Sequence, residues 1–418
     1  MDLYTLIIGA SSVIILSFFF GEMARKTNIP SVLMLIILGL IIQYTTGPLI
    51  NKEELNFLLT ILGTVGLIMI VLEAALELKL TRDKYIPIAK ALFIALVSLL
   101  ASTYAAAWIL WRFVDGMDMA TAWLYATPLS ILSSAIIIPS VGALKEDKKE
   151  FHIYESTFSD IMGIMLFYFL TGQLEAGGES QGLAGFGGNV LLTIVLSIIA
   201  SYIIIFIFQQ IKSHTKLFLL IAVLLLLYAV GKMMHLSSLI IILIFGLLIA
   251  NMKLFFRGKL GQWLHVERAN QIYEGLHVIT METAFVVRTF FFVIFGLTIS
   301  LASLVNAQVA MISLLIIASI YAIRYLILRV FIGKDILPQL YIAPRGLITI
   351  LLFYAIPESA KVEGFEPGVL LFIIIATSII MTLALIKDKQ LASLAIKKAN
   401  EKPVEYERWE APKADRYE

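Results

Sequence analysis

Apolar residues dominate the chain in long runs, which short polar, Gly-containing or Pro-containing segments separate. Most runs have close to the roughly 20 residues that a helix needs to cross a bilayer. The pattern predicts thirteen membrane-spanning helices, at about 3–20, 30–46, 57–78, 87–110, 120–144, 151–173, 187–211, 215–232, 236–252, 279–301, 307–331, 338–356 and 368–386. The expected fold class is therefore an all-α membrane protein.

The composition excludes several classes of protein. Hydrophobic residues make up 60% of the 418 positions and charged residues 15%, against about 45 to 50% and 25% in soluble domains. The net charge of +2 gives no reason to expect a nucleic-acid partner. With zero cysteines, disulfides and thiol chemistry are excluded. We expect no enzyme and no cofactor, and without a phosphate-binding loop the driving force must be an ion gradient.

Basic residues are distributed unequally between the two sets of connections. The connections that follow odd-numbered helices carry 15, namely Arg25, Lys26, Lys79, Arg82, Lys84, Lys145, Lys148, Lys149, Lys212, Lys216, Lys253, Arg257, Lys259, Arg268 and Lys334. The other set carries 4, namely Lys52, Arg112, Lys232 and Lys361. Because cytoplasmic loops are enriched in Lys and Arg, we expect a multi-pass protein of the plasma or inner membrane, with its N-terminus outside and its C-terminus in the cytoplasm.

The thirteen helices can be divided as six, one and six. This predicts two inverted repeats, at about 1–173 and 213–387, within one transmembrane domain of residues 1–387. Residues 388–418 carry charges of both signs and are too few for a folded domain of their own. We expect a short polar cytoplasmic tail.

Two predicted helices at corresponding positions of the repeats are interrupted. The helix at 120–144 contains Pro128, Ser133, Ser134 and Pro139, and the helix at 338–356 contains the run 343–346, Ala-Pro-Arg-Gly. A matched pair of interrupted helices is the best sequence indication of a transport site, since their unpaired backbone groups must be satisfied within the protein. We expect the two breaks to cross near the membrane midplane and to offer carbonyls and half-helix ends to an ion.

Ionisable residues inside the spans are costly in lipid and mark candidate functional sites. The central candidate is Asp160 in the helix at 151–173, because Ser156 and Ser159 lie on or beside the same helical face. Carboxylate and hydroxyl oxygens suit Na⁺, K⁺ or H⁺. A carboxylate that opens alternately to each side binds a proton or a metal ion in competition.

The other intramembrane charges need partners. Glu155 points roughly 140° away from Asp160 around the helix, and we expect it to form a structural ion pair with Arg345, whose guanidinium demands a carboxylate. Arg288 either pairs with Asp160 or sets the local potential. Glu73 lies within reach of the cavity or is solvated near the cytoplasmic end.

Three further residues are expected at the membrane interface rather than in the site. Arg324 and Arg329 approach the cytoplasmic end of the helix at 307–331, where long basic side chains extend to the headgroups. His152, at the entry of its helix, either tunes a pH response or is an ordinary interfacial histidine.

Three motifs resemble those of the monovalent cation:proton antiporters, in the branch of NhaP and the eukaryotic sodium/proton exchangers. ESTFSD at 155–160 resembles E-S-x-x-N-D, Ala-Pro-Arg-Gly at 343–346 resembles P-R-G, and LEAALEL at 72–78 resembles F-E-x-G-L-E-L. The resemblance implies that Asp160 is the ion and proton site, that Arg345 pairs with Glu155, that the protein is a homodimer, and that its core moves like an elevator.

Two departures bear on the choice of cation. Ser159 replaces the usual Asn, and Ser133-Ser134 with the residues that follow replaces T-D-P, which looks more like the L-S-S-T of the KefC-like branch. That branch also has a basic residue at the position of Arg288. The expected ligands are Asp160 with Ser156 and Ser159, backbone carbonyls around Ser133 and Ser134, and Glu73.

These observations predict an antiporter that exchanges Na⁺, or else K⁺ or Li⁺, for H⁺. With a single site carboxylate, one proton replaces one cation and the exchange is electroneutral. The alternatives are a K⁺/H⁺ antiporter of KefC-like type and a channel or solute permease on the same fold, and a permease for anions would instead need an unpaired Arg.

Overall fold

The computed structural model describes residues 3–27, 30–46, 52–80, 84–142, 144–175, 183–211, 216–234, 238–256, 265–298 and 306–401. Within these residues the chain is helical and contains no strand. The helices of the first half are α1 Leu3–Thr27, α2 Ser31–Thr46, α3 Lys52–Glu77, α4 Tyr85–Phe113, α5 Met119–Ser130, α6 Ser134–Ser140 and α7 Glu146–Glu175. Those of the second half are α8 Leu183–Phe208, α9 Lys216–Met233, α10 Ser238–Ala250, α11 Met252–Phe255, α13 Val266–Thr298, α14 Ala307–Phe331, η4 Gln339–Tyr341, α15 Leu347–Tyr354, η5 Glu358–Ala360 and α16 Gly368–Glu401.

Each of the thirteen predicted spans coincides with one helix or with an interrupted pair. Among the described residues, eight helical segments are long and apolar enough to cross a membrane, and α2 and α10 are shorter apolar helices. The all-α membrane fold is confirmed, while the count of thirteen and the repeats remain predictions. The boundaries differ most at two places: α13 begins at Val266 rather than near 279, and α16 continues to Glu401 beyond the predicted end of the transmembrane domain.

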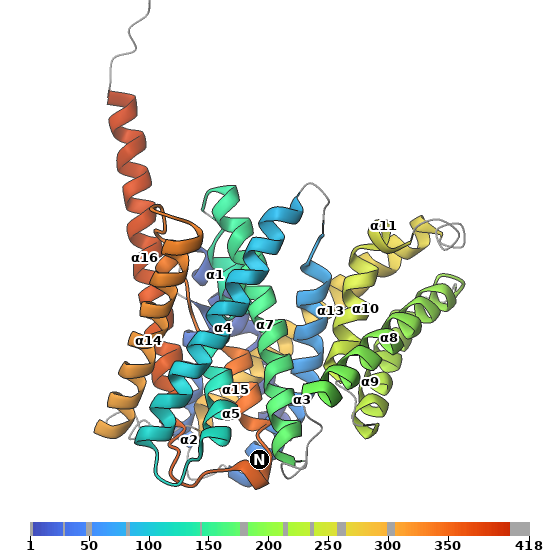
Figure 1. Ribbon diagram of the computed structural model, residues 1–418, viewed down its shortest axis with the longest axis horizontal. Helices are drawn as coiled ribbons and strands as arrows, with labels where there is room; N and C mark the ends of the chain where they lie inside the picture. The colour runs from blue at the N-terminus through green and yellow to red at the C-terminus, as the bar shows by residue number, and fades with distance from the viewer. Residues whose placement is uncertain are drawn as a thin grey trace, which may run out of the picture.

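By their contacts the helices form two groups that share the apolar core. Figure 1 shows α8, α9, α10 and α11 at one side of the molecule and α14 and α16 at the other. In one group α4 packs against α5, α7 and α14, and α14 packs against α16. In the other group α13 packs against α2 and α3, and α10 packs against α3, α8 and α9. Helix α16 projects beyond the rest of the bundle at the top of the view. The broken helices and α7 belong to the first group, which therefore holds most of the candidate residues.

Two glycines permit a close contact between α2 and α13 in the second group. A Cβ atom at Gly296 of α13 would overlap the carbonyl oxygen of Ile36 and lie 3.0 Å from the Cα of Gly39 on α2. Equally, a Cβ at Gly39 would overlap the carbonyl oxygen of Val293. The two backbones approach this closely because neither glycine carries a side chain, as is common where membrane helices pack.

Candidate cation and proton site

Both predicted helix breaks are present, and a backbone hydrogen bond joins them. Helix α5 ends at Ser130 and α6 begins at Ser134, while extended residues separate η4 from α15. The amide of Ser133 in the first break donates to the carbonyl oxygen of Pro344 in the second, at 3.0 Å. A Cβ at Gly346 would lie 2.5 Å from the hydroxyl oxygen of Ser133. The expectation that the two breaks meet is confirmed.

Asp160 lies where the first break meets α7. Its carboxylate is 2% exposed, and Oδ2 accepts hydrogen bonds from the Ser134 hydroxyl and from the Ser134 amide, the latter at 3.3 Å. Oδ1 is buried and has no hydrogen-bond partner among the described residues. One carboxylate oxygen is therefore anchored at the start of α6, where the helix dipole favours negative charge, and the other retains its full capacity to take a proton or a cation.

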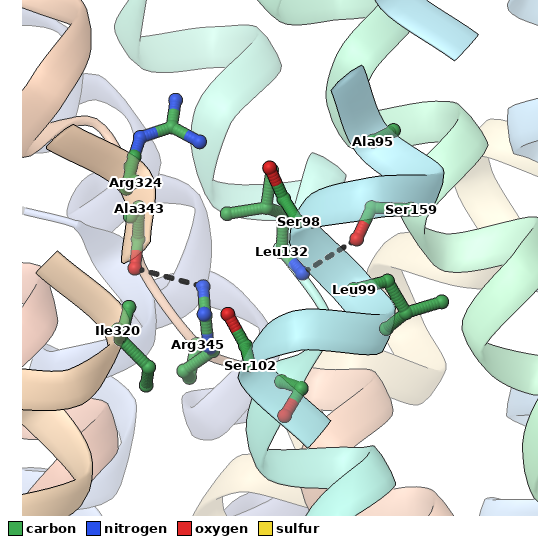
Figure 2. Close-up of a pocket in the computed structure, with 11 residues that line it drawn as sticks. Ala95, Ser98, Leu99, Ser102, Leu132, Ser159, Ile320, Arg324, Ala343 and Arg345 are labelled. Carbon is green, nitrogen blue, oxygen red and sulfur yellow. Dashed lines mark hydrogen bonds between the residues drawn. The ribbon is translucent and has the colours of Figure 1, made fainter. Parts of the chain in front are cut away.

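The predicted serines divide into two sets. The hydroxyl oxygen of Ser159 accepts a hydrogen bond from the amide of Leu132 at 3.0 Å (Figure 2), and Ser134 holds Asp160 as described. Ser156 instead donates its hydroxyl to the carbonyl oxygen of His152 on its own helix, at 2.7 Å. The structure thus brings Ser134 and Ser159 to the first break through their side chains and Ser133 through its backbone, whereas the hydroxyl hydrogen of Ser156 is already engaged within α7.

The predicted partner of Glu155 was wrong. Arg324 on α14 donates to both carboxylate oxygens of Glu155, at 2.8 and 2.9 Å, in the parallel geometry that favours Arg over Lys. The Nε of Arg324 donates to the carbonyl oxygen of Gln339 at 3.1 Å. Arg324 is 3% exposed, so the expectation that it extends to the membrane surface was also wrong.

His152 lies in the same buried cluster rather than at the interface. Its side chain is fully buried, and its Nδ1 lies 3.3 Å from Oε2 of Glu155, one turn further along α7. The Phe151 ring lies edge-on to it, at 5.3 Å between centroids. The interfacial interpretation of this histidine was wrong.

Arg345 contacts carbonyl oxygens instead of a carboxylate. Its Nε donates to the carbonyl oxygen of Leu129 at 2.7 Å and its Nη1 to that of Ala343 at 3.1 Å. Its backbone amide donates to the hydroxyl of Thr377 on α16 at 3.1 Å. Arg345 therefore joins the end of α5 to the second break, and its guanidinium stabilises the C-terminal end of α5, where the helix dipole is negative.

Glu73 and Arg288 pair with each other in the second group of helices. Arg288 on α13 donates to Oε1 of Glu73 on α3 at 3.1 Å. The suggested pairing of Arg288 with Asp160 is therefore wrong. A cation at Glu73 would have to compete with this guanidinium.

Arg324 is the functional residue that the sequence reasoning misplaced. The buried face of α14 includes Ile316, Ile320, Arg324, Ile327 and Leu328, which recur at intervals of three and four residues. An arginine within a helix stripe that is otherwise apolar faces the protein interior rather than lipid. That spacing was the signal for its burial.

Comparisons with known proteins bear on the fold and the family. A family model described as sodium/hydrogen exchanger, transmembrane, matches residues 13–387. The chain is similar in structure to the sodium proton antiporter MjNhaP1 from Methanocaldococcus jannaschii at pH 8, with a TM-score of 0.68 and 21% identity over 92% of this chain and 99% of that chain. An electron microscopy structure of the same antiporter is similar with a TM-score of 0.66 and 19% identity, and the match covers 96% of this chain and 99% of that chain. Comparison with curated protein sequences finds no match.

Proposed function

The chain belongs to the sodium/hydrogen exchanger family, whose members are multi-pass membrane antiporters rather than enzymes, and from this premise we propose that Asp160 binds a monovalent cation and a proton in competition. The observation that carries the proposal is the buried Oδ1 of Asp160, which has no hydrogen-bond partner in the described part of the chain and lies beside the crossing of two broken helices. A proton on Oδ1 removes the charge that attracts the cation, and a bound cation occupies the lone pairs that would take the proton. Competition of this kind couples the two fluxes.

The surroundings of Asp160 support the same mechanism. Ser134 holds Oδ2 through its amide and hydroxyl, so that Oδ1 keeps a fixed position while its occupant changes. The oxygens of Ser134, Ser159 and the carbonyls of the first break complete the proposed ligand set, with Ser133, Ser156 and Glu73 as outer members. Na⁺ is the first choice of cation, and K⁺ and Li⁺ are the alternatives.

Alternating access is proposed to arise from movement of the group that contains the broken helices. That group holds Asp160, Glu155, Arg324 and Arg345, whereas the Glu73–Arg288 pair ties α3 to α13 in the other group. We expect an elevator movement of the first group against the second, and a homodimer formed by the second. Crosslinking of paired cysteines across α3 and α7 tests this: if the bond leaves exchange intact, relative movement of the groups is not required.

The orientation is proposed from the charge asymmetry, with the N-terminus outside and the C-terminus in the cytoplasm of the plasma or inner membrane. Because the chain has no cysteine, single cysteines can be introduced without background. A cysteine at Lys145 should react with an impermeant maleimide only from the cytoplasmic side, and one at Asp115 only from outside. The opposite labelling pattern would reverse the orientation.

Replacement of the site carboxylate tests the proposed function directly. Na⁺, K⁺ and Li⁺ are added in turn to everted vesicles with an imposed pH gradient. The pH gradient should be dissipated only by an ion that the protein transports. Asp160→Asn should abolish this response, since the amide is nearly isosteric but neither ionises nor takes up a proton. Full exchange in this variant contradicts the site assignment.

Matched variants separate loss of the site from loss of fold. Asp147→Asn alters an exposed carboxylate on the same helix α7 and should leave exchange unchanged. Ser134→Ala removes the hydroxyl that binds Asp160 and should raise the cation concentration for half-maximal exchange several-fold. Ser140→Ala removes a hydroxyl from the same short helix α6, one bonded only to the carbonyl of Ile136, and should not. A current without proton movement would favour the rival channel function.

A further inference from the structure

A small cavity with both apolar and polar lining lies beside Arg345, between α4 and the two helix breaks (Figure 2). Its lining includes Ser98 and Ser102 of α4, Ser130 and Ser159, and the two guanidinium-bearing residues Arg324 and Arg345. The space open to the centre of a water molecule is about 10 Å³, which is close to what one water-sized occupant needs. The cavity is therefore matched to a single small molecule or ion.

The polar side chains that line this cavity are four serines, whose hydroxyls donate or accept, and two arginines, whose guanidinium groups only donate. Ser98 and Ser102 are one helical turn apart, and Figure 2 draws both hydroxyls on the side of α4 that faces Arg345. The buried hydroxyl of Ser98 has no hydrogen-bond partner among the described residues, and none is recorded for the hydroxyl of Ser102, whose side chain is 4% exposed. Two hydroxyls that are each able to donate to an occupant thus face a guanidinium, a group that has donors and no acceptor.

The positive charge of Arg345 is only partly balanced. Its side-chain hydrogen bonds go to two neutral carbonyl oxygens, and a helix end contributes only about half an elementary charge. Both oxygens of the neighbouring carboxylate, Glu155, are engaged by Arg324. A guanidinium that is 2% exposed is costly without a full counter-charge.

We propose that the cavity between Ser98, Ser102 and Arg345 binds one small monovalent anion of the size of chloride. The two serine hydroxyls and the guanidinium supply donors from opposite sides, and the anion completes the counter-charge of Arg345. A water molecule would satisfy the hydroxyls but would leave the charge unbalanced.

The anion also has a consequence for coupling, which rests on the proposed function. Among the described residues, the buried side chains of the moving group that carry charge are two acids, Glu155 and Asp160, and two arginines, Arg324 and Arg345, while the buried His152 is counted as neutral. Without an anion their charges sum to zero when Asp160 is ionised and unoccupied, and to plus one when it holds a proton or a cation. With an anion both loaded forms are neutral and the unloaded form is negative. Net charge is costly in the membrane interior. The anion therefore allows the group to move when Asp160 holds a proton or a cation, and opposes its movement when Asp160 is unoccupied.

The test measures anion binding and does not depend on transport. The full-length protein in detergent is unfolded by heat at constant Na⁺ and ionic strength while chloride is replaced stepwise by gluconate. A ligand that binds only the folded state stabilises it, and we expect the melting temperature in saturating chloride to exceed that in gluconate by about 2 to 4 °C. Bromide should replace chloride.

Variants and anomalous scattering locate the site. The double substitution Ser98→Ala and Ser102→Ala should remove the chloride dependence, whereas Ser319→Ala, which deletes a hydroxyl of α14 bonded to the carbonyl of Ile316, should retain it. Crystals grown in bromide should show an anomalous peak between Ser102 and Arg345, which decides the matter even if the double variant fails to fold. Equal melting temperatures in both anions, or a bromide-grown crystal without the peak, would overturn the proposal and leave a water site.

Discussion

At the scale of single residues, Glu155 is held by one arginine and lies near a second. Removal of one member of a buried ion pair leaves the other charge unbalanced in a medium of low polarity, at a cost of about 3 to 5 kcal/mol. Glu155→Gln and Arg324→Gln should therefore each lower the melting temperature strongly, and the double variant should lose less than the sum of the two. The coupling of Glu155→Gln with Arg345→Gln should be smaller. A larger coupling with Arg345 than with Arg324 would contradict the observed pairing.

The difference between the predicted and the observed partner of Glu155 shows how much of a site a single sequence determines. Asp160 was predicted correctly as a buried carboxylate, because its position in the apolar run and its serine neighbours are local features. The partner of Glu155 is 169 positions away along the chain. A helical pattern indicates the depth of a residue and the face it occupies, but two arginines on different helices satisfy the same requirement. Only the packing of α14 and α7 against α4 decides between them.

At the scale of helices, the two breaks were predictable and the bond between them was not. Pro128, Pro139 and the Ala-Pro-Arg-Gly run remove backbone donors or favour extended conformations, and the helices end close to these positions. The hydrogen bond from Ser133 to Pro344 depends on how two distant segments approach each other, about which the local pattern is silent.

The two breaks are anchored in similar ways, which supports the predicted inverted repeats. Asp160 on α7 accepts from the amide of Ser134 in the first break, and Thr377 on α16 accepts from the amide of Arg345 in the second. In the six, one and six division, α7 and α16 are counterparts. In the predicted repeats, a carboxylate would therefore occupy one of the two corresponding positions and a neutral hydroxyl the other.

The contact of α2 with α13 gives a prediction at the same scale. Gly296→Ala places a methyl group against the backbone of Ile36 and Gly39, where no side chain can rotate away, so the helices must separate. Overpacking of this kind costs about 1 to 3 kcal/mol, and the melting temperature should fall. Gly172→Ala in α7 is the control, since a Cβ there meets nothing within 4 Å and alanine favours a helix. An unchanged melting temperature for Gly296→Ala would indicate that the two helices are not in contact.

At the scale of the whole molecule, the balance of buried charge predicts the stoichiometry. In the described part of the group that contains the broken helices, Glu155 is engaged by Arg324, and guanidinium groups do not release protons at working pH. Asp160 is then the single group that alternates between proton and cation, so one H⁺ exchanges for one cation and no net charge crosses the membrane. A bound anion that stays in place alters neither flux.

This stoichiometry can be tested in proteoliposomes. A membrane potential is imposed with a permeant ion that the antiporter itself does not transport. The opposing Na⁺ and H⁺ gradients at which net exchange stops should be unaffected by the potential. If two protons exchanged for one cation, each turnover would move one net charge. A membrane potential of about 59 mV would then change the Na⁺ gradient at which net exchange stops about tenfold. Such a shift would require a second titrating group to cycle with Asp160. His152 would be the first residue to replace, because its buried imidazole can take up a proton and its Nδ1 lies 3.3 Å from Glu155.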